Sequence, residues 1–175
     1  RHLIYAPVSG PRVERRYLAN KLLEILTNPH ADYQIVLSKG EPSSEAHPKK
    51  YSDFTVYDWI DDLTQFELLK ACDLLVCRAG HGIITKALTY GKPLLLIPIP
   101  DQTEQYGNAK RAVRLGVAEV IMQTELNEEK LFKAAEKILN SDIYERRAQQ
   151  IADMTATLDA TQTAMEVVKQ LASRS

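Results

Sequence analysis

"CDLLVCRAGHGIITKALTYGKP", residues Cys72–Pro93, is the stretch from which the fold of this chain can be inferred. It begins with an apolar run, passes through a turn that contains Gly80 and Gly82, and continues with a helical pattern that ends at a second turn. A continuous apolar run that leads into a helix is typical of a buried strand in a parallel sheet. The two glycines either permit a sharp strand-to-helix turn or clear room for a bound phosphate, and the pattern leaves both interpretations open.

Short apolar runs alternate with helical periodicity along the rest of the chain. Strands are predicted at "HLIYA" (His2–Ala6), "YQIVLS" (Tyr33–Ser38), "FTVYDW" (54–59), "DLLVC" (73–77), "PLLLIP" (93–98) and "AEVIM" (118–122). Helices are predicted over "PRVERRYLANKLLEILTN" (11–28), at Leu63–Ala71, over "GHGIITKALTYG" (80–91), at Glu104–Leu115 and throughout 127–175. The polar segment "KGEPSSEAHPKK" (39–50) is predicted to be a loop. This alternation predicts one doubly wound α/β domain with a parallel sheet and a helical tail.

The composition is that of a globular domain of 175 residues, of which 45% are hydrophobic. Its 22 basic and 23 acidic residues nearly cancel, so there is no electrostatic reason to expect a nucleic-acid partner. No apolar run approaches the roughly 20 residues that span a bilayer, so we expect no direct membrane insertion. Cys72 and Cys77 do not form a disulfide pattern, which favours buried thiols and a reducing cytosolic setting. Because the chain begins at Arg1, without a methionine, we expect a piece of a longer protein.

Three loops are expected to form the binding edge of the sheet, because ligands of doubly wound sheets bind beyond the carboxyl ends of the strands. These loops are "APVSGPR" (Ala6–Arg12), "CRAGHGIIT" (Cys77–Thr85) and "PIPDQTEQYGNA" (98–109). In the second loop a phosphate could approach the unpaired amides of Gly82, Ile83 and Ile84, at the start of a helix whose partial positive charge favours an anion.

Common nucleotide and hydrolase motifs fit poorly. "GHGIIT" lacks the third glycine of G-x-G-x-x-G and follows the fourth predicted strand, whereas a dinucleotide fingerprint follows the first strand of its unit. The sequence contains no G-x-x-x-x-G-K-[ST] and no G-x-S-x-G, so a P-loop nucleotide triphosphatase and an α/β-hydrolase both lack support.

Four motifs in a fixed order, "WIDD", "CRAGHG", "GKPLLLIP" and "QYGNA", resemble the C-terminal, donor-binding domain of GT-B glycosyltransferases. The similarity is greatest to glycosyltransferase family 28, the family of the N-acetylglucosaminyltransferase that completes the peptidoglycan lipid precursor. It covers nearly the whole chain and is most specific from Asp58 to Ile121. The resemblance implies that residues 1–175 form a single nucleotide-sugar-binding domain, a Rossmann-like half of a GT-B fold, with C-terminal helices over 127–175. The N-terminal acceptor domain is expected to lie outside this chain.

The resemblance also implies which residues would contact the donor. The base would meet the main chain at Ile60, with Trp59 shaping that wall, although both could instead be core residues at a strand end. The expected donor-binding residues are Ser9, Gly10, Gly80, His81, Gly82 and Ile83 for the diphosphate, and Lys86, Asp101, Glu104 and Gln105 for the ribose or the transferred sugar. Asn108 is expected to cap or brace its loop. His81 could contact a phosphate oxygen, cap the turn or act as a base; since the base of this fold usually comes from the other domain, no catalytic residue is assigned.

Lys86 departs from the family pattern, which commonly has a glutamate that accepts hydrogen bonds from the donor ribose. A lysine has only donors, so that contact cannot form in the usual way. Either Glu104 or Asp101 takes over the contact, or the ribose is bound loosely, or the nucleotide differs. Lys86 could also add positive charge near a diphosphate, or point into solvent from its helix.

The resemblance implies a hexosyltransferase that moves N-acetylglucosamine or a similar sugar from a nucleoside-diphosphate donor, with UDP expected, to an acceptor hydroxyl. No D-x-D sequence is present, so we expect neither a metal nor a cofactor. The acceptor half and the general base would come from an N-terminal domain or from a separate, membrane-associated subunit. The last helix would reach back toward that half. The protein would be cytoplasmic, and at the membrane surface through the missing half.

Two other function classes stay open. A nucleotide-sugar 2-epimerase shares this architecture and also needs a second domain. A non-catalytic nucleotide-sugar-binding subunit or sensor would explain a lysine at position 86. The sequence does not identify the sugar, the acceptor or the nucleotide.

Overall fold

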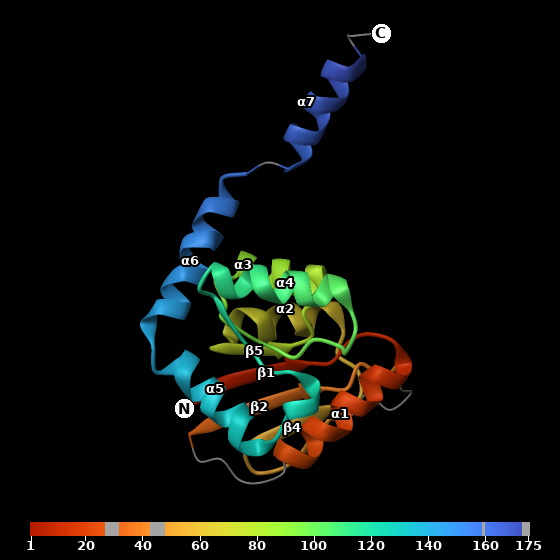
Figure 1. Ribbon diagram of the computed structural model, residues 1–175, viewed down its shortest axis with the longest axis vertical. Helices are drawn as coiled ribbons and strands as arrows, with labels where there is room; N and C mark the ends of the chain where they lie inside the picture. The colour runs from red at the N-terminus through yellow and green to blue at the C-terminus, as the bar shows by residue number, and fades with distance from the viewer. Residues whose placement is uncertain (27–31, 43–47, 159, 173–175) are drawn as a thin grey trace.

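A seven-stranded sheet lies at the centre of the computed structural model, which describes residues 1–26, 32–42, 48–158 and 160–172 (Figure 1). The strand order is β3-β4-β2-β1-β5-β6-β7, and every neighbouring pair is parallel except β3 with β4. The strands are β1 (His2–Pro7), β2 (Tyr33–Ser38), β3 (Lys49–Lys50), β4 (Phe54–Tyr57), β5 (Leu74–Cys77), β6 (Leu94–Leu96) and β7 (Ala118–Val120). The predicted α/β fold with a parallel sheet is confirmed.

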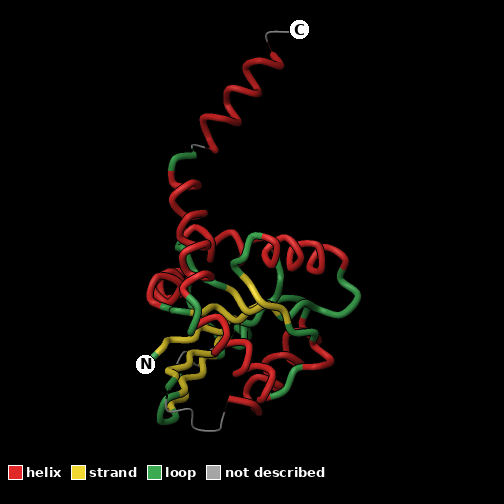
Figure 2. The backbone as a smooth tube through the Cα atoms, turned by 60° about the vertical axis from the view of Figure 1, so that its left-hand side comes forward, coloured by secondary structure: helices red, strands yellow, loops and turns green. Residues whose placement is uncertain are grey.

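Helices cover both faces of this sheet (Figures 1 and 2). One face is covered by α1 and α5, and the other by α2, α3 and α4, as the two buried clusters of apolar side chains show. The helices are α1 (Arg12–Leu26), α2 (Asp62–Ala71), α3 (His81–Thr89), α4 (Thr103–Arg114), α5 (Glu128–Leu139), α6 (Asp142–Ala156) and α7 (Ala160–Ala172), with a short 3₁₀ helix, η1 (Gln123–Glu125).

The central strands are apolar throughout because both of their faces are buried. In β5, Leu74 and Val76 pack against α1 and α5, whereas Leu75 and Cys77 pack against the helices of the other face. Successive side chains of a strand point to opposite faces, so a strand covered on both sides needs an apolar residue at each position. Tyr5 of β1 follows the same rule and is fully buried among α2-side residues.

Two helices begin at residues whose side chains cap them. The Asp61 carboxylate accepts a hydrogen bond from the Thr64 amide at 2.9 Å at the start of α2. The Asn127 side chain accepts one from the Lys130 amide, also at 2.9 Å, at the start of α5. Such caps satisfy amides that have no partner within the helix. The start of α3 has no such cap, a difference that matters for the site.

Several predicted strands end earlier than expected, η1 was not predicted, and residues 27 and 28 of the predicted helix 11–28 lie outside the described chain. Two differences are larger. Lys49 and Lys50, the last residues of the predicted loop 39–50, form β3, which pairs antiparallel with β4. Main-chain pairing at a sheet edge needs no apolar side chains, so the pattern gave no signal for it; residues 43–47 of the same loop lie outside the described chain. The predicted helical tail is three separate helices, of which α6 packs against α3 and α7 projects away from the sheet (Figure 1).

Candidate functional site

Two of the three predicted loops meet at the carboxyl edge of the sheet. β1, β5 and β6 are neighbours in the sheet and parallel, so the loops after them leave from the same edge. Gly10 of the first loop has φ +116°, and a Cβ atom on it would lie 3.2 Å from Cδ1 of Ile99 in the third loop. The first and third loops are therefore in contact, with the exposed Ser9 beside them.

The backbone at the start of α3, in the second loop, distinguishes the two interpretations of Gly80 and Gly82, a sharp turn or room for a phosphate. Gly80 has φ −71° and ψ 142°, and neither Gly80 nor Gly82 has a positive φ, so any residue could adopt these backbone conformations. A Cβ atom on either glycine would have no other part of the described chain within 4 Å, its sequence neighbours and own helix aside. Neither the turn nor the packing therefore requires glycine here. What the two glycines provide is open space in front of the first turn of α3.

The main-chain amides of that first turn point into this space without a side-chain cap. The first intrahelical bond joins the Ile84 amide to the Gly80 carbonyl at 3.3 Å, so the prediction that the Ile84 amide is unpaired is wrong. The amides of His81, Gly82 and Ile83 have no acceptor within the helix. His81 is exposed, and its carbonyl accepts a hydrogen bond from the Thr85 hydroxyl at 2.9 Å. The arrangement presents unpaired donors and the positive end of a helix dipole at one point, which suits an anion.

Side chains of α4 hold the third loop against the second. The Gln105 side-chain oxygen accepts a hydrogen bond from the Ile99 amide at 2.9 Å, so this residue is buried and partly committed to its own loop. Asn108 donates to the Ala79 carbonyl at 3.1 Å and to the Glu104 carboxylate at 3.2 Å. The bracing role expected for Asn108 is what these contacts show.

Asp101 marks the turn before α4. It is exposed and has φ +60°, and it is the one residue other than glycine with a positive φ among those that the structure describes. Aspartate tolerates this conformation better than most residues because its short side chain can form local hydrogen bonds. Its amide donates to the Tyr106 hydroxyl at 3.2 Å.

Trp59 and Ile60 differ in their surroundings. The side chain of Ile60 is buried in the same cluster as Ile84 and Ala79, close to the start of α3. Trp59 is 53% exposed, which is unusual for the largest side chain of the chain. Ile60 is therefore a core residue, as the alternative interpretation had it, and Trp59 is not.

Lys86 extends from α3 to α2. Its ammonium donates to the Gln65 side-chain oxygen at 3.0 Å and lies 5.3 Å from the centre of the Phe66 ring. One of the alternatives, a lysine that points into solvent, is therefore wrong. Two N–H groups remain on the ammonium after the bond to Gln65, so the side chain can still donate to an oxygen of a ligand.

Arg78 is a residue of this edge that the sequence interpretation missed. It directly follows β5, is 1% exposed, and donates to the Ile97 carbonyl at 3.2 Å and to the Glu14 carbonyl at 2.8 Å. Its guanidinium also donates to the side-chain oxygen of Gln123. Burial lowers the pKa of Arg78 to about 10, against the opposing effect of the Glu14 carboxylate, so the group stays charged at neutral pH. The sequence feature that could have identified Arg78 is a cationic residue directly after an apolar strand.

The two cysteines are free, buried thiols. Burial raises the pKa of Cys72 to about 12 and raises that of Cys77 as well. Thiolates are the reactive form of cysteine, so neither residue is suited to nucleophilic or redox chemistry near neutral pH.

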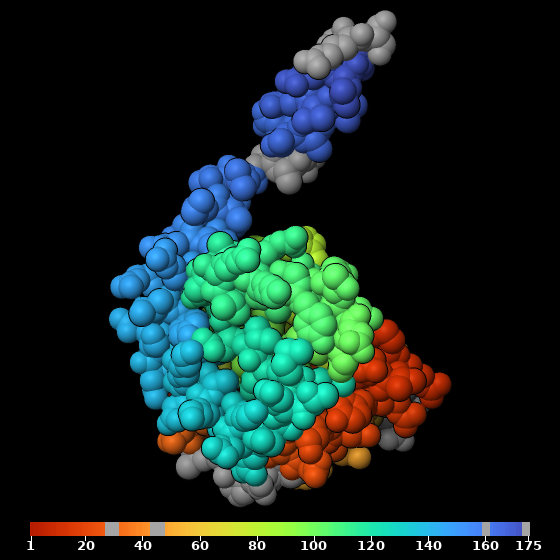
Figure 3. All heavy atoms as spheres, in the orientation of Figure 1, coloured from red at the N-terminus to blue at the C-terminus, as the bar shows by residue number. Residues whose placement is uncertain are grey.

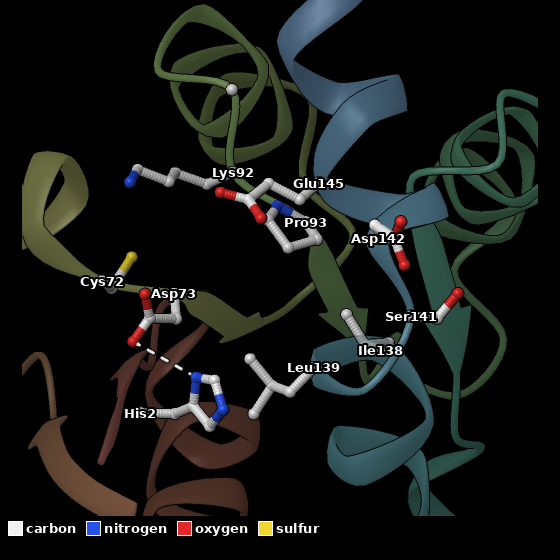
Figure 4. A pocket seen from close by; sticks show the side chains of 11 residues that line it. His2, Cys72, Asp73, Lys92, Pro93, Ile138, Leu139, Ser141, Asp142 and Glu145 are labelled. Carbon is white, nitrogen blue, oxygen red and sulfur yellow. Dashed lines mark ion pairs between the residues drawn. The ribbon is translucent and has the colours of Figure 1, made fainter.

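Two cavities lie away from the predicted residues. One, of about 80 Å³, is at the amino edge of the sheet between His2, Asp73, Lys92 and Glu145 (Figure 4). The other is an open groove of about 690 Å³ between α4 and Met122, on the side of the molecule that Figure 3 shows. Neither is lined by a residue predicted to bind the donor, so the candidate site depends on the geometry of the loops.

Within the described ranges, no three His, Cys, Asp or Glu side chains lie close enough together to hold a metal ion. No helix in the described part of the chain is both long and apolar enough to cross a membrane.

Known proteins that are similar to this chain are glycosyltransferases. The model of the glycosyltransferase family 28 C-terminal domain matches residues 14–171. The UDP-N-acetylglucosamine–N-acetylmuramyl-(pentapeptide) pyrophosphoryl-undecaprenol N-acetylglucosamine transferase of Lactobacillus delbrueckii subsp. bulgaricus is 26% identical over 98% of this chain and 47% of its own length. The protein of the same name from Alkaliphilus metalliredigens is 31% identical over 81% of this chain and 39% of its own length. The chain thus spans about half the length of the curated relatives it matches.

Solved structures share the fold at lower identity. The calicheamicin glycosyltransferase CalG4 matches 99% of this chain and 44% of its own with a TM-score of 0.77 and 15% identity. The glycosyltransferase VinC, solved in complex with DTDP, matches 100% of this chain and 42% of its own with a TM-score of 0.74 and 21% identity. Together with the family model, these similarities show that the chain has the fold of one half of a GT-B glycosyltransferase and belongs to glycosyltransferase family 28 as its C-terminal domain.

Proposed function

We propose that this chain is the donor-binding half of a glycosyltransferase and that it binds a nucleoside-diphosphate sugar at the carboxyl edge of the sheet. The transferred group would be N-acetylglucosamine or a similar hexosyl group on UDP, and the acceptor a hydroxyl group. The names of the curated relatives support this donor, because those proteins are UDP-N-acetylglucosamine-dependent transferases. The complex of VinC with DTDP supports a nucleoside diphosphate as the shared ligand chemistry of the fold.

The observation that carries the proposal is the uncapped, open start of α3. In hexosyl transfer, the bond between the sugar carbon and the diphosphate oxygen breaks while the acceptor oxygen bonds to that carbon. Negative charge therefore grows on the departing diphosphate. The amides of His81, Gly82 and Ile83 would donate to its oxygens, and fixed donors of this kind stabilise the charge without having to reorient.

The other predicted residues would then surround the diphosphate. Ser9 and Gly10 lie on the neighbouring loop, and the exposed Trp59 offers a flat apolar surface for the base beside the main chain of Ile60. We assign the sugar or ribose to the side of Asp101, Glu104, Gln105 and Lys86. The Gln105 oxygen already accepts from Ile99, so we assign the donation to the sugar to the amide nitrogen of that side chain.

The acceptor half and the general base would be supplied from outside this chain. The relatives are about twice as long as the matched region, which is compatible with an N-terminal acceptor domain or a separate, membrane-associated subunit.

We propose that α7 packs on that acceptor half, because Met165, Val168 and Leu171 of α7 are between 52% and 64% exposed. The acceptors of the named relatives are linked to undecaprenol, which supports a site of action at a membrane surface in the cytoplasm.

Calorimetric titration with UDP, GDP and UDP-N-acetylglucosamine would test the proposal. We expect UDP to bind more tightly than GDP, and Lys86→Glu to tighten UDP binding by about tenfold because a carboxylate can accept hydrogen bonds from the ribose hydroxyls. Lys110→Glu is the matched control: it makes the same charge change at an exposed lysine of α4 that is not among the predicted site residues, and it should leave UDP binding unchanged.

Other results would change the interpretation in defined ways. Loss of UDP binding in Lys86→Glu alone would mean that the lysine itself holds the phosphates. Absence of nucleotide binding by both the parent chain and Lys86→Glu would contradict the proposal that this half binds the donor by itself.

A further inference from the structure

Arg78 joins the three loops of the carboxyl edge. Arg78 is the second residue of the second loop, Ile97 directly precedes the third loop, and Glu14 lies in the first turn of α1, which begins where the first loop ends. One guanidinium contacts the carbonyl oxygens of Ile97 and Glu14 and the side chain of Gln123, and Gln123 in turn donates to the Glu14 carboxylate at 3.3 Å. Four segments far apart in the sequence therefore meet at one side chain.

Stability alone does not explain why a charged residue occupies this position. The Arg78 Nη2 atom is 3.9 Å from the Glu14 carboxylate, too far for a hydrogen bond, and Nε of Arg78 has no hydrogen-bond partner among the described residues. Burying a charge without a close counter-ion is costly, and apolar residues of similar volume often serve a core as well or better. The benefit of the arginine must then lie in the arrangement it imposes.

We propose that Arg78 is a positioning residue for donor binding: its planar, five-donor fork holds the three loops in the arrangement that the diphosphate needs, without touching the donor. A guanidinium has its donors in fixed directions, so acceptors on several segments are held in one relative geometry, which a flexible ammonium cannot reproduce. This inference rests on the proposed function for its ligand, but the geometry of the loops can be tested without one.

The first test compares UDP with uridine on the parent chain, Arg78→Met and Arg78→Lys. Arg78→Met keeps an unbranched, flexible stem, shorter than that of arginine, and removes all donors, so we expect UDP affinity to fall by about tenfold or more. Uridine affinity should change much less, because the wall of Trp59 and Ile60 belongs to the loop after β4, to which Arg78 makes no hydrogen bond. Arg78→Lys keeps the charge and loses the fork, so it should resemble Arg78→Met rather than the parent.

Two control variants separate positioning from simple loss of stability. Ile138→Ala removes a side chain that is 2% exposed, on α5 at the opposite edge of the sheet, and should lower stability while leaving UDP affinity unchanged. Glu14→Gln keeps the carbonyl that accepts from Arg78 and a side-chain oxygen that can accept from Gln123, so its UDP affinity should stay within about twofold of the parent.

The second test is hydrogen exchange of the amides in residues 8–11, 79–83 and 97–102, with no nucleotide present. Arg78→Met should speed exchange in all three loops relative to Ile138→Ala at equal global stability. If Arg78→Met matches Ile138→Ala in both loop exchange and UDP affinity, the inference is overturned. If the parent chain binds no UDP, the proposed function fails, and the exchange measurement still decides whether Arg78 positions the loops.

Discussion

Each edge of the sheet has a helix that begins without a side-chain cap, but only at one edge is that helix start also free of acidic side chains. At the amino edge the Leu3 amide donates to the Asp73 carboxylate at 2.7 Å, and the Asp73 amide donates back to the Leu3 carbonyl at 2.8 Å. The same carboxylate lies 3.6 Å from Nδ1 of His2 (Figure 4). At the carboxyl edge the first turn of α3 has no side-chain cap. At the amino edge α6 also begins without a side-chain cap, but its first turn carries Asp142 and Glu145, whereas the first turn of α3 carries no acidic side chain. The carboxyl edge therefore suits an external anion better than the amino edge does.

This difference shows that a cavity and a binding site need not coincide. The cavity between His2 and Glu145 lies at the edge where Asp73 pairs with His2 and where the first turn of α6 carries Asp142 and Glu145. The start of α3 has a helix dipole and free amides but is an open surface. An open surface of this kind is what a cleft between two domains looks like when one domain is considered by itself. The glycines of the two edges allow this contrast to be tested.

The largest effect is expected from Gly82→Leu at the carboxyl edge. The new side chain would occupy the open space in front of α3 and block the amides, so UDP affinity should fall by about 100-fold or more, since hydrogen bonds to charged groups contribute roughly 1.5–3 kcal/mol each. The melting temperature should not fall, because leucine is a better helix former than glycine. Titration and thermal unfolding of the same sample give both values; UDP binding equal to that of the parent would remove the phosphate role of this turn.

An intermediate effect is expected from Gly91→Ala at the amino edge. Gly91 has φ +64°, and its Cβ would lie 2.4 Å from the side-chain oxygen of Gln149 on α6. The left-handed conformation alone costs about 1–2 kcal/mol, so the free energy of unfolding in urea should fall by at least that amount, while the folded fraction binds UDP normally.

Gly116→Ala is the matched control for this variant. Gly116 has φ +73°, but its Cβ would meet Arg147 only at an ordinary 3.6 Å, so the difference between the two variants reports the contact with Gln149. Equal losses of stability in the two variants would show that the chain relieves this contact without cost. A loss of UDP affinity in Gly91→Ala would mean that the two edges are not independent.

The smallest effect concerns the thiol of Cys72, beside the amino-edge cavity. Burial raises its pKa from 9.0 to about 12, so above about pH 9 the unfolded chain loses this proton while the folded chain keeps it. The folded state then binds more protons than the unfolded state, and stability should decline as pH rises from about 9 toward about 12. Urea midpoints across this range should show a shallower decline in Cys72→Ala; an identical decline in both proteins would contradict the assignment.

Much of the fold could be predicted from local patterns. The strand Tyr33–Ser38 was predicted at its observed bounds, and the predicted helix Leu63–Ala71 begins one residue after the observed start of α2. These elements depend on side-chain periods of 2 and 3.6 residues, which a short window of sequence contains. Strand β3 was missed because Lys49 and Lys50 pair through their main chain, and no apolar pattern accompanies such pairing.

The candidate site, too, could be predicted only in part from the sequence. The sequence by itself determined that glycines stand where a buried strand passes into a helix, and therefore that amides are exposed at the start of α3. Only the tertiary structure decided that these glycines are free of packing, that Lys86 reaches Gln65, and that Arg78 contacts residues 19, 45 and 64 positions away. Such contacts depend on which strands are neighbours in the sheet and on how the loops at their ends face one another. No local period of the sequence encodes that arrangement.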